Sequence, residues 1–188
     1  PRLLEDNPNV YLSMGTTAEN VAKKYQLTRK IQQDFAITSH QKASEAESKG
    51  NFKNEITTIN NCSKDGGIRP GTNQEILNGL KLAFDEHGTI TAGTSSPLTD
   101  GAAATLICEE EYAKKNNLDI LARIVSTAVE GCPPEVMGLG PIGASEKALK
   151  RANLSIKDID IVELNEAFAS QSLACIKDLN IEEKKVNL

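Results

Sequence analysis

An asparagine near the end of the chain stands where α/β proteins often place their chemistry. Residues 159–164 alternate apolar and acidic side chains, which is typical of a half-buried strand, and residues 169–175 have helical spacing. Asn165 directly follows the strand. Side chains at this end of a strand point into a crevice, and helix N-termini there favour negative charge. A neutral amide at this point can hold a water or an oxyanion without titrating. The alternative is that Asn165 only caps the helix.

An arginine and two histidines are the other polar candidates. Arg69 lies in a glycine- and proline-containing loop, where its planar cation can pair with a phosphate or stack on an adenine, unless it is simply solvated. His40 falls on a predicted helix and has no Cys, carboxylate or second His at ligand spacing, and His87 lies in a turn. Both histidines are therefore interpreted as structural.

The cysteines show no pattern of a reactive or metal-binding site. No Cys-x-x-Cys pair occurs, so the sequence predicts no metal site. Cys108 ends an apolar run and Cys175 lies on the apolar face of a predicted helix, so both are expected in the core. Cys132 precedes two prolines in a turn, and Cys62 lies in a polar loop. All four are interpreted as reduced structural thiols.

Composition excludes several classes of protein. The chain has 188 residues and a formal net charge of −5, whereas a nucleic-acid-binding module normally carries a basic patch. No apolar run reaches the roughly 18 to 20 residues that span a bilayer. With 39% hydrophobic residues the chain can build an ordinary core, and a cytoplasmic location is expected.

The first half of the chain is predicted to be mostly helical. Thr16 and Glu19 have the spacing of a capping box at the start of one helix. Thr28 opens a second helix, which is expected to end at Gly50. A third helix is predicted over residues 73–84, and residues 93–99 form a loop of small residues.

The second half alternates predicted strands and helices, which indicates a βαβ arrangement with parallel or mixed strands. Residues 102–108 are almost entirely apolar, as in a strand buried on both faces. The predicted strands are 52–59, 89–92, 102–108, 120–129 and 159–164, the predicted helices are 109–116 and 144–152, and a glycine-rich loop covers 138–143.

Several short stretches carry a family resemblance in a consistent order along the chain. They are Met14-Gly15-Thr16-Thr17-Ala18-Glu19-Asn20, Gly88-Thr89-Ile90-Thr91-Ala92-Gly93-Thr94-Ser95-Ser96, Asp100-Gly101-Ala102-Ala103-Ala104, Met137-Gly138-Leu139-Gly140-Pro141 and Asn165-Glu166-Ala167-Phe168. Together they resemble the thiolases, which make or cleave 3-ketoacyl-CoA thioesters. The resemblance extends over nearly the whole chain.

The resemblance implies an α/β, thiolase-like fold. Residues 1–98 would be the mostly helical loop domain, which binds CoA and takes part in assembly. Residues 99–120 would be the last strand and helix of the N-terminal half, and residues 121–188 the start of the C-terminal half. The family's nucleophilic cysteine, its Gly-His-Pro histidine and its Cys-x-Gly cysteine have no counterpart here. The chain is therefore expected to be an internal, inactive piece of a longer enzyme.

The resemblance also implies roles for particular residues. Asn165 would be catalytic, holding a water or donors for the oxyanion together with the family's histidine. Arg69 would contact CoA, and Ser96 would hydrogen-bond the pantetheine arm, although a turn serine is the alternative. The CoA channel or acyl pocket would be lined by Phe84, Met14, Met137 and Phe168, which could otherwise be core residues. Two residues depart from biosynthetic members of the family: Ser13 replaces a histidine and Ile76 a CoA-contacting serine.

The implied function is part of a degradative 3-ketoacyl-CoA thiolase, which uses CoA to release acetyl-CoA and a shortened acyl-CoA. The expected partners are acyl-CoA and CoA as substrates, with no further cofactor, and the full enzyme is expected to be a homodimer or homotetramer. One alternative is an acetyl-CoA acetyltransferase that forms acetoacetyl-CoA. Another is a non-catalytic module that binds acyl-CoA or serves assembly.

Overall fold

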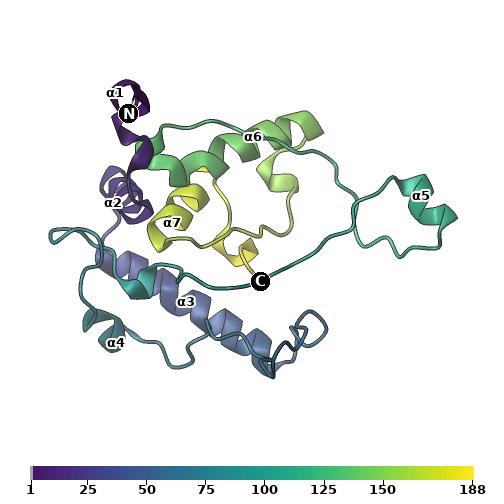
Figure 1. Cartoon of the computed structure of the whole chain (residues 1–188), viewed down its shortest axis with the longest axis horizontal. Coiled ribbons are helices and arrows are strands. Elements are labelled where there is room, and N and C mark those ends of the chain that lie inside the picture. Colours follow the sequence, from purple (N-terminus) through teal and green to yellow (C-terminus); the bar gives the residue numbers. More distant parts are fainter. Residues whose placement is uncertain (1) are drawn as a thin grey trace.

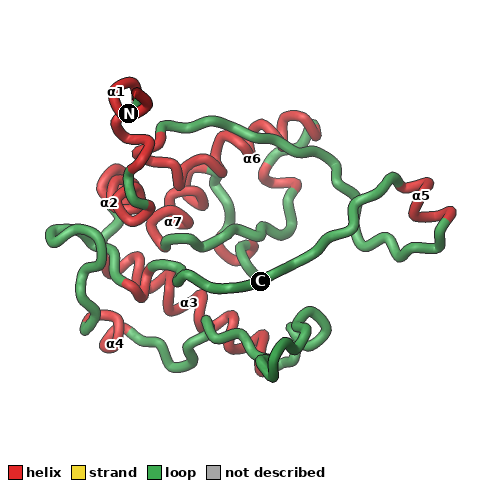
Figure 2. Tube along the Cα trace, in the orientation of Figure 1, coloured by secondary structure: helices red, strands yellow, loops and turns green. Residues whose placement is uncertain are grey.

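The computed structural model describes residues 2–188, and all regular structure within that range is helical (Figures 1 and 2). Extended segments of the described residues meet only at isolated bridges, such as the parallel bridge between Val162 and Val186. The α-helices are α1 (Arg2–Asp6), α2 (Met14–Tyr25), α3 (Arg29–Ser48), α4 (Gln74–Asn78), α5 (Glu110–Lys115), α6 (Gly140–Ala152) and α7 (Ala169–Asp178). Short 3₁₀ helices are η1 (Pro8–Tyr11), η2 (Ala92–Thr94), η3 (Pro134–Leu139), η4 (Ile156–Asp158) and η5 (Glu183–Lys185).

Local capping chemistry fixes the starts of the two long N-terminal helices. The Thr28 hydroxyl accepts the N–H of Ile31 at 3.3 Å, so the predicted start of α3 is confirmed. After α3 the chain turns at Gly50, whose φ of +76° favours glycine. The capping box predicted for α2 is wrong, because Ser13 is the N-cap and accepts the N–H of Thr16 at 3.1 Å.

The core lies where α2, α3 and η3 pack around α7. Val21 of α2 and Cys175 of α7 are fully buried. A second apolar cluster continues from α7 into residues 179–188, called the C-terminal segment. Its buried members are Ile176, Leu179, Ile181 and Val186. Figure 1 shows α7 between α2, α3 and α6. The start of α7 is therefore held from several sides.

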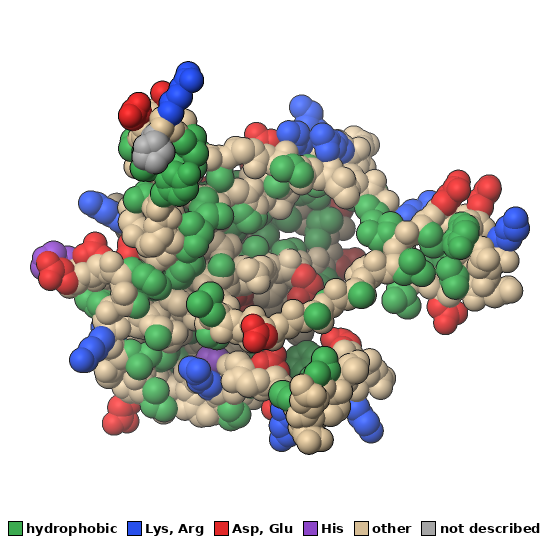
Figure 3. Space-filling model, in the orientation of Figure 1, with side chains coloured by type: hydrophobic (Ala, Val, Ile, Leu, Met, Phe, Trp, Pro, Cys, Tyr) green, Lys and Arg blue, Asp and Glu red, His purple; other side chains and the backbone are tan. Residues whose placement is uncertain are grey.

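Two long apolar segments that were predicted as strands do not form strands within residues 2–188. Residues 102–108 and most of 120–129 are exposed and contain no helix or strand, and they carry α5 away from the rest of the structure (Figure 1). Leu106 is 78% exposed and Leu121 is 96% exposed. Figure 3 shows apolar side chains gathered on this arm. A strand needs a neighbour for its backbone N–H and C=O groups, and no described segment forms a backbone ladder with either of these two. Residues 126–129 contact α6 only through side chains, such as the Ser126 hydroxyl, which donates to the carbonyl of Ala148 at 2.7 Å.

Other element predictions were correct in part. The helices expected at 109–116 and 144–152 are confirmed as α5 and α6. The predicted helix 73–84 ends early, at Asn78. Residues 138–143 are helical rather than a loop, because Pro141 is compatible with the first turn of α6. Residues 52–59, 89–92 and 159–164 form no strand, although Ile59, Thr91 and Val162 each make one bridge.

Candidate functional site

Asn165 lies in the irregular segment between the Val162 bridge and α7. It does not cap the helix, since the N-cap of α7 is Phe168, which makes no side-chain capping bond. Among the described residues, no hydrogen bond is made by the Asn165 side chain, which is exposed. The capping alternative is therefore wrong, and the amide is free to bind something else.

Two cavities meet at Asn165. One has a volume of about 640 Å³, and its lining is mostly apolar residues of α6 and of the segment 156–168. The other has a volume of about 590 Å³ and lies between α3 and residues 93–97. Glu163, Leu164 and Asn165 line both cavities and so form the wall between them. A ligand in either cavity can reach the Asn165 amide.

Most of the predicted site residues come together around these cavities. Met14, Met137 and Phe168 line the larger one, and Ser96 lines the other. Met14 is 49% exposed and Met137 is 43% exposed, so neither is an ordinary core residue. Their side chains provide an apolar surface that a ligand can contact.

Phe84 completes the apolar surface from a different part of the chain. Its ring packs edge-on against that of Phe168, with 5.9 Å between the ring centroids. Gly15 makes this approach possible, because a Cβ atom there would lie 2.0 Å from the Phe84 ring. The Met-Gly pair at the start of α2 therefore shapes this part of the site.

The loop of small residues is joined directly to the segment that carries Asn165. The backbone N–H of Ser96 donates to the carbonyl of Ala167 at 2.9 Å, beside the bridge between Ser95 and Phe168. The side chain of Ser96 remains exposed. Its hydroxyl is therefore available on the wall of the second cavity.

Arg69, like Phe84, lines neither cavity. It is exposed, and its backbone N–H donates to Nδ1 of His40 at 3.4 Å. His40 does line the second cavity, so the Arg69 loop lies at its border. Burial lowers the pKa of His40, the cation of Arg69 lowers it further, and Glu166 partly opposes both effects.

Glu19 holds residues 89–90 in place beside α2. Its assignment to a capping box meant that this role was not predicted from the sequence. Its carboxylate accepts the backbone N–H groups of Thr89 at 3.0 Å and of Ile90 at 2.9 Å. A Cβ at Gly88 would lie 2.2 Å from this carboxylate, so glycine is required for the approach. Glu19 thus ties α2 to the chain just before the loop of small residues.

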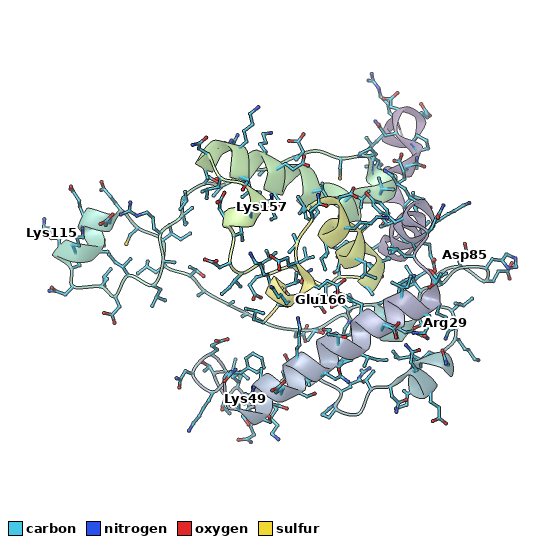
Figure 4. All side chains as sticks on the ribbon, turned by 180° about the vertical axis from the view of Figure 1, so that it is seen from behind. Arg29, Lys49, Asp85, Lys115, Lys157 and Glu166 are labelled. Atoms are coloured by element: carbon cyan, nitrogen blue, oxygen red, sulfur yellow. The ribbon has the colours of Figure 1, made fainter. Side chains whose placement is uncertain are left out.

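A second group of positioning residues surrounds Glu166, which Figure 4 shows between α3 and α7. Its carboxylate accepts the hydroxyl of Ser39 at 2.5 Å and Nδ2 of Asn187 at 2.7 Å. Glu166 belongs to a recognised motif, but no local pattern pointed to Ser39 or Asn187, because each lies far from Glu166 in the sequence.

The cysteines differ in burial. Cys175 is fully buried and its pKa is raised, mainly by that burial, as expected for a structural thiol. Cys132 is half-buried and Cys62 is exposed. The expectation that Cys108 lies in the core is wrong, since it is exposed at the end of the extended segment 102–108. Within residues 2–188 no three His, Cys, Asp or Glu side chains are grouped as they would be around a metal ion.

Comparison with protein families decides the assignment. The family model for the thiolase N-terminal domain matches residues 4–111, and the model for the thiolase C-terminal domain matches residues 118–188. This chain belongs to the thiolase family. A 3-ketoacyl-CoA thiolase of Bacillus subtilis is 45% identical over 99% of the chain, and one of Photobacterium profundum is 50% identical over 93%. The chain covers 52% and 49% of these proteins, about half the length of the curated relatives.

Solved thiolase structures show the same fold. The dimeric peroxisomal thiolase of Saccharomyces cerevisiae matches the whole chain with a TM-score of 0.94 and 40% identity, and the chain covers 50% of it. Human mitochondrial 3-ketoacyl-CoA thiolase in complex with CoA matches 96% of the chain with a TM-score of 0.92 and 42% identity, and the chain covers 47% of it. The expected α/β thiolase-like fold is therefore confirmed, although the sheet strands do not pair within residues 2–188 of this thiolase chain.

No helix in residues 2–188 of the thiolase chain is both long and apolar enough to cross a membrane.

Proposed function

We propose that this chain supplies the oxyanion-stabilising amide and part of the CoA site of a 3-ketoacyl-CoA thiolase, an acyltransferase that takes part in fatty-acid β-oxidation. The observation that carries the proposal is the free Asn165 amide at the wall between two cavities. The names of the Bacillus and Photobacterium relatives support the choice of reaction.

In the proposed reaction a cysteine thiolate attacks the ketone carbonyl of a 3-ketoacyl-CoA. The C–C bond breaks and its electron pair stays on acetyl-CoA, which takes a proton from a donor in the rest of the protein and leaves. The acyl group stays on the enzyme as a thioester until the thiol of a second CoA gives up its proton, attacks the thioester and releases the cysteine thiolate. The role of Asn165 is to donate its N–H, directly or through a water, to the negative oxygen that develops. The nucleophilic cysteine and the histidine would come from the rest of the full-length protein, meaning a protein of the same length as the curated relatives.

We assign the remaining site residues by their positions. Ser96 would bind the pantetheine arm from the second cavity, and Arg69 would meet the adenine or phosphates at its border. The acyl group would lie against the apolar surface of the larger cavity, contributed by Met14, Met137 and Phe168, and Phe84 would extend this surface from its contact with the Phe168 ring.

The proposed domain division follows the same lines. Residues 1–98 would form the loop domain, 99–120 the end of the N-terminal half and 121–188 the start of the C-terminal half. The two family-model matches, which leave residues 112–117 between them, support a boundary in this region. A homo-oligomer is supported by the dimeric yeast neighbour, and a cytoplasmic location by the bacterial relatives. Light scattering and fluorescent tagging of the full-length protein test these two points.

A thiolysis assay of the full-length protein with acetoacetyl-CoA and longer 3-ketoacyl-CoAs tests the proposal. Cleavage of long substrates supports a degradative thiolase. Activity on acetoacetyl-CoA alone would favour the second candidate, an acetoacetyl-CoA-forming acetyltransferase. This candidate is supported by the similarity to Bacillus anthracis acetyl-CoA acetyltransferase, which has a TM-score of 0.89 and 40% identity. CoA binding with no turnover of any substrate would refute both reactions and leave a non-catalytic binding module.

A further inference from the structure

The segment before Asn165 is paired with the C-terminal segment in a short parallel ladder. The N–H of Val162 donates to the carbonyl of Lys185 at 2.8 Å, and the N–H of Asn187 donates to the carbonyl of Val162 at 2.9 Å. In a regular parallel ladder the next donor, the N–H of Leu164, would pair with the main-chain carbonyl of Asn187. That bond is not formed.

The Asn187 side chain takes the place of the missing backbone partner. Its Oδ1 accepts the N–H of Leu164 at 2.8 Å, and its Nδ2 donates to the carbonyl of Leu164 at 2.9 Å. The backbone of Asn187 is left-handed, with a φ of +48°, which interrupts the extended ladder. Asparagine tolerates this conformation, and its carboxamide carries a donor and an acceptor as a peptide group does.

The same carboxamide also holds the residue on the other side of Asn165. Nδ2 of Asn187 donates to Oε1 of Glu166 at 2.7 Å, while Ser39 of α3 donates to Oε2 of that carboxylate. Both neighbours of Asn165 are thereby fixed to one side chain. Asn165 itself makes no side-chain hydrogen bond to residues 2–188, so its direction depends on these neighbours.

We propose that Asn187 is a positioning residue for the Asn165 amide: it clamps the Leu164 peptide on one side and the Glu166 carboxylate on the other. This inference rests on the proposed function in one respect, namely that Asn165 acts on the substrate. The clamp itself is a structural statement that can be measured without activity.

The first test is Asn187→Gly in the full-length protein. Glycine keeps the left-handed backbone accessible and removes only the carboxamide. Hydrogen exchange at the Leu164 amide should accelerate. A misplaced catalytic group can cost on the order of a hundredfold, so kcat for thiolysis should fall roughly tenfold to a hundredfold. The KM for CoA should stay within about twofold, since uniform binding is untouched.

Asn153→Gly is the matched control. Asn153 is also left-handed, with a φ of +56°, but it ends α6 and lines neither cavity. This variant should leave kcat and the exchange of Leu164 at wild-type values. If Asn187→Gly behaves like Asn153→Gly in both measurements, the inference is overturned.

A rescue experiment separates the clamp from a general loss of structure. Asn187→Asp removes the Nδ2 donor and places a second carboxylate beside Glu166, so kcat should fall. Adding Glu166→Gln supplies an N–H₂ group that can donate to the new carboxylate, and part of kcat should return. A double variant that is no faster than Asn187→Asp would contradict the direct contact.

The two proposals fail in different ways. If the wild-type full-length protein turns over no 3-ketoacyl-CoA, the proposed function fails, and the exchange of Leu164 alone then decides about the clamp. Unchanged exchange in Asn187→Gly overturns the clamp even if the enzyme is active.

Discussion

Replacing Asn165 by alanine removes one hydrogen-bond donor from the wall between the two cavities. In the full-length protein the loss of one such donor should raise the activation barrier by about 2.7 to 4 kcal/mol, which corresponds to roughly a hundredfold to thousandfold fall in kcat. CoA binding should change little, because the proposed CoA contacts lie at Ser96 and Arg69. The effect should therefore appear in kcat rather than in KM for CoA.

The same substitution should leave the fold intact. Asn165 is exposed, and its side chain makes no hydrogen bond to the described residues, so alanine leaves no buried partner unsatisfied. The free energy of unfolding should change by no more than about 0.5 kcal/mol, as for most surface positions. A denaturant titration run beside the kinetic assay checks this point.

Two variants sharpen the comparison. Asn165→Asp keeps the shape but exchanges the donor for a negative charge, so its kcat should fall at least as far as that of Asn165→Ala. Asn9→Ala changes an exposed asparagine that lines neither cavity and should leave kcat unchanged. A wild-type kcat in Asn165→Ala, with a folded protein, would refute the role of the amide.

Three further predictions concern the surroundings of the site. Gly15→Ala should destabilise the fold by about 1 to 3 kcal/mol, because its new methyl group would lie 2.0 Å from the Phe84 ring, and a lower Tm would show it. Glu19→Ala leaves the backbone N–H groups of Thr89 and Ile90 without their acceptor and should cost about 1 to 3 kcal/mol per buried group in urea unfolding. An unchanged midpoint would contradict the contact. Because the pKa of His40 is lowered in the folded state, the unfolded chain binds more protons than the folded one. The contribution of His40 to the free energy of unfolding is therefore present above about pH 6.5 and is lost as the pH falls below that value. The free energy of unfolding, measured from pH 8 to pH 5, should depend less steeply on pH in His40→Gln than in the wild type. In the wild type, hydrogen exchange at the Arg69 amide should become faster at low pH, because protonated His40 no longer accepts its N–H.

Helix starts could be predicted from the sequence because their signals are local. Thr28 caps α3 through a residue three positions later, and the chain turns at Gly50 through its own backbone freedom. Glu19 shows the limit of this reasoning. Its spacing from Thr16 fits a capping box, yet its carboxylate binds N–H groups 70 and 71 positions away. A sequence pattern cannot rank a near partner against a distant one.

Strands could not be predicted in the same way, because a strand is defined by a neighbour that the segment itself does not contain. The apolar run 102–108 has the composition of a buried strand, but no segment of residues 2–188 pairs with it and it remains exposed. By contrast, residues 159–164 find a partial partner through the Val162 bridge to the C-terminal segment. That bridge is parallel, but it joins Val162 to a segment that was not among the predicted strands.

The candidate site divides along the same line between local and distant signals. The motif around Asn165 could be found because its residues are consecutive, and the structure brings Met14, Ser96 and Met137 to the same two cavities. Asn187 escaped notice because its importance depends on a left-handed backbone and on a ladder that breaks off at that residue. An amide that must point at a reacting oxygen gains from being unpaired itself, since a partner would compete with the substrate. Its orientation then has to come from its neighbours, which are the groups that Asn187 binds.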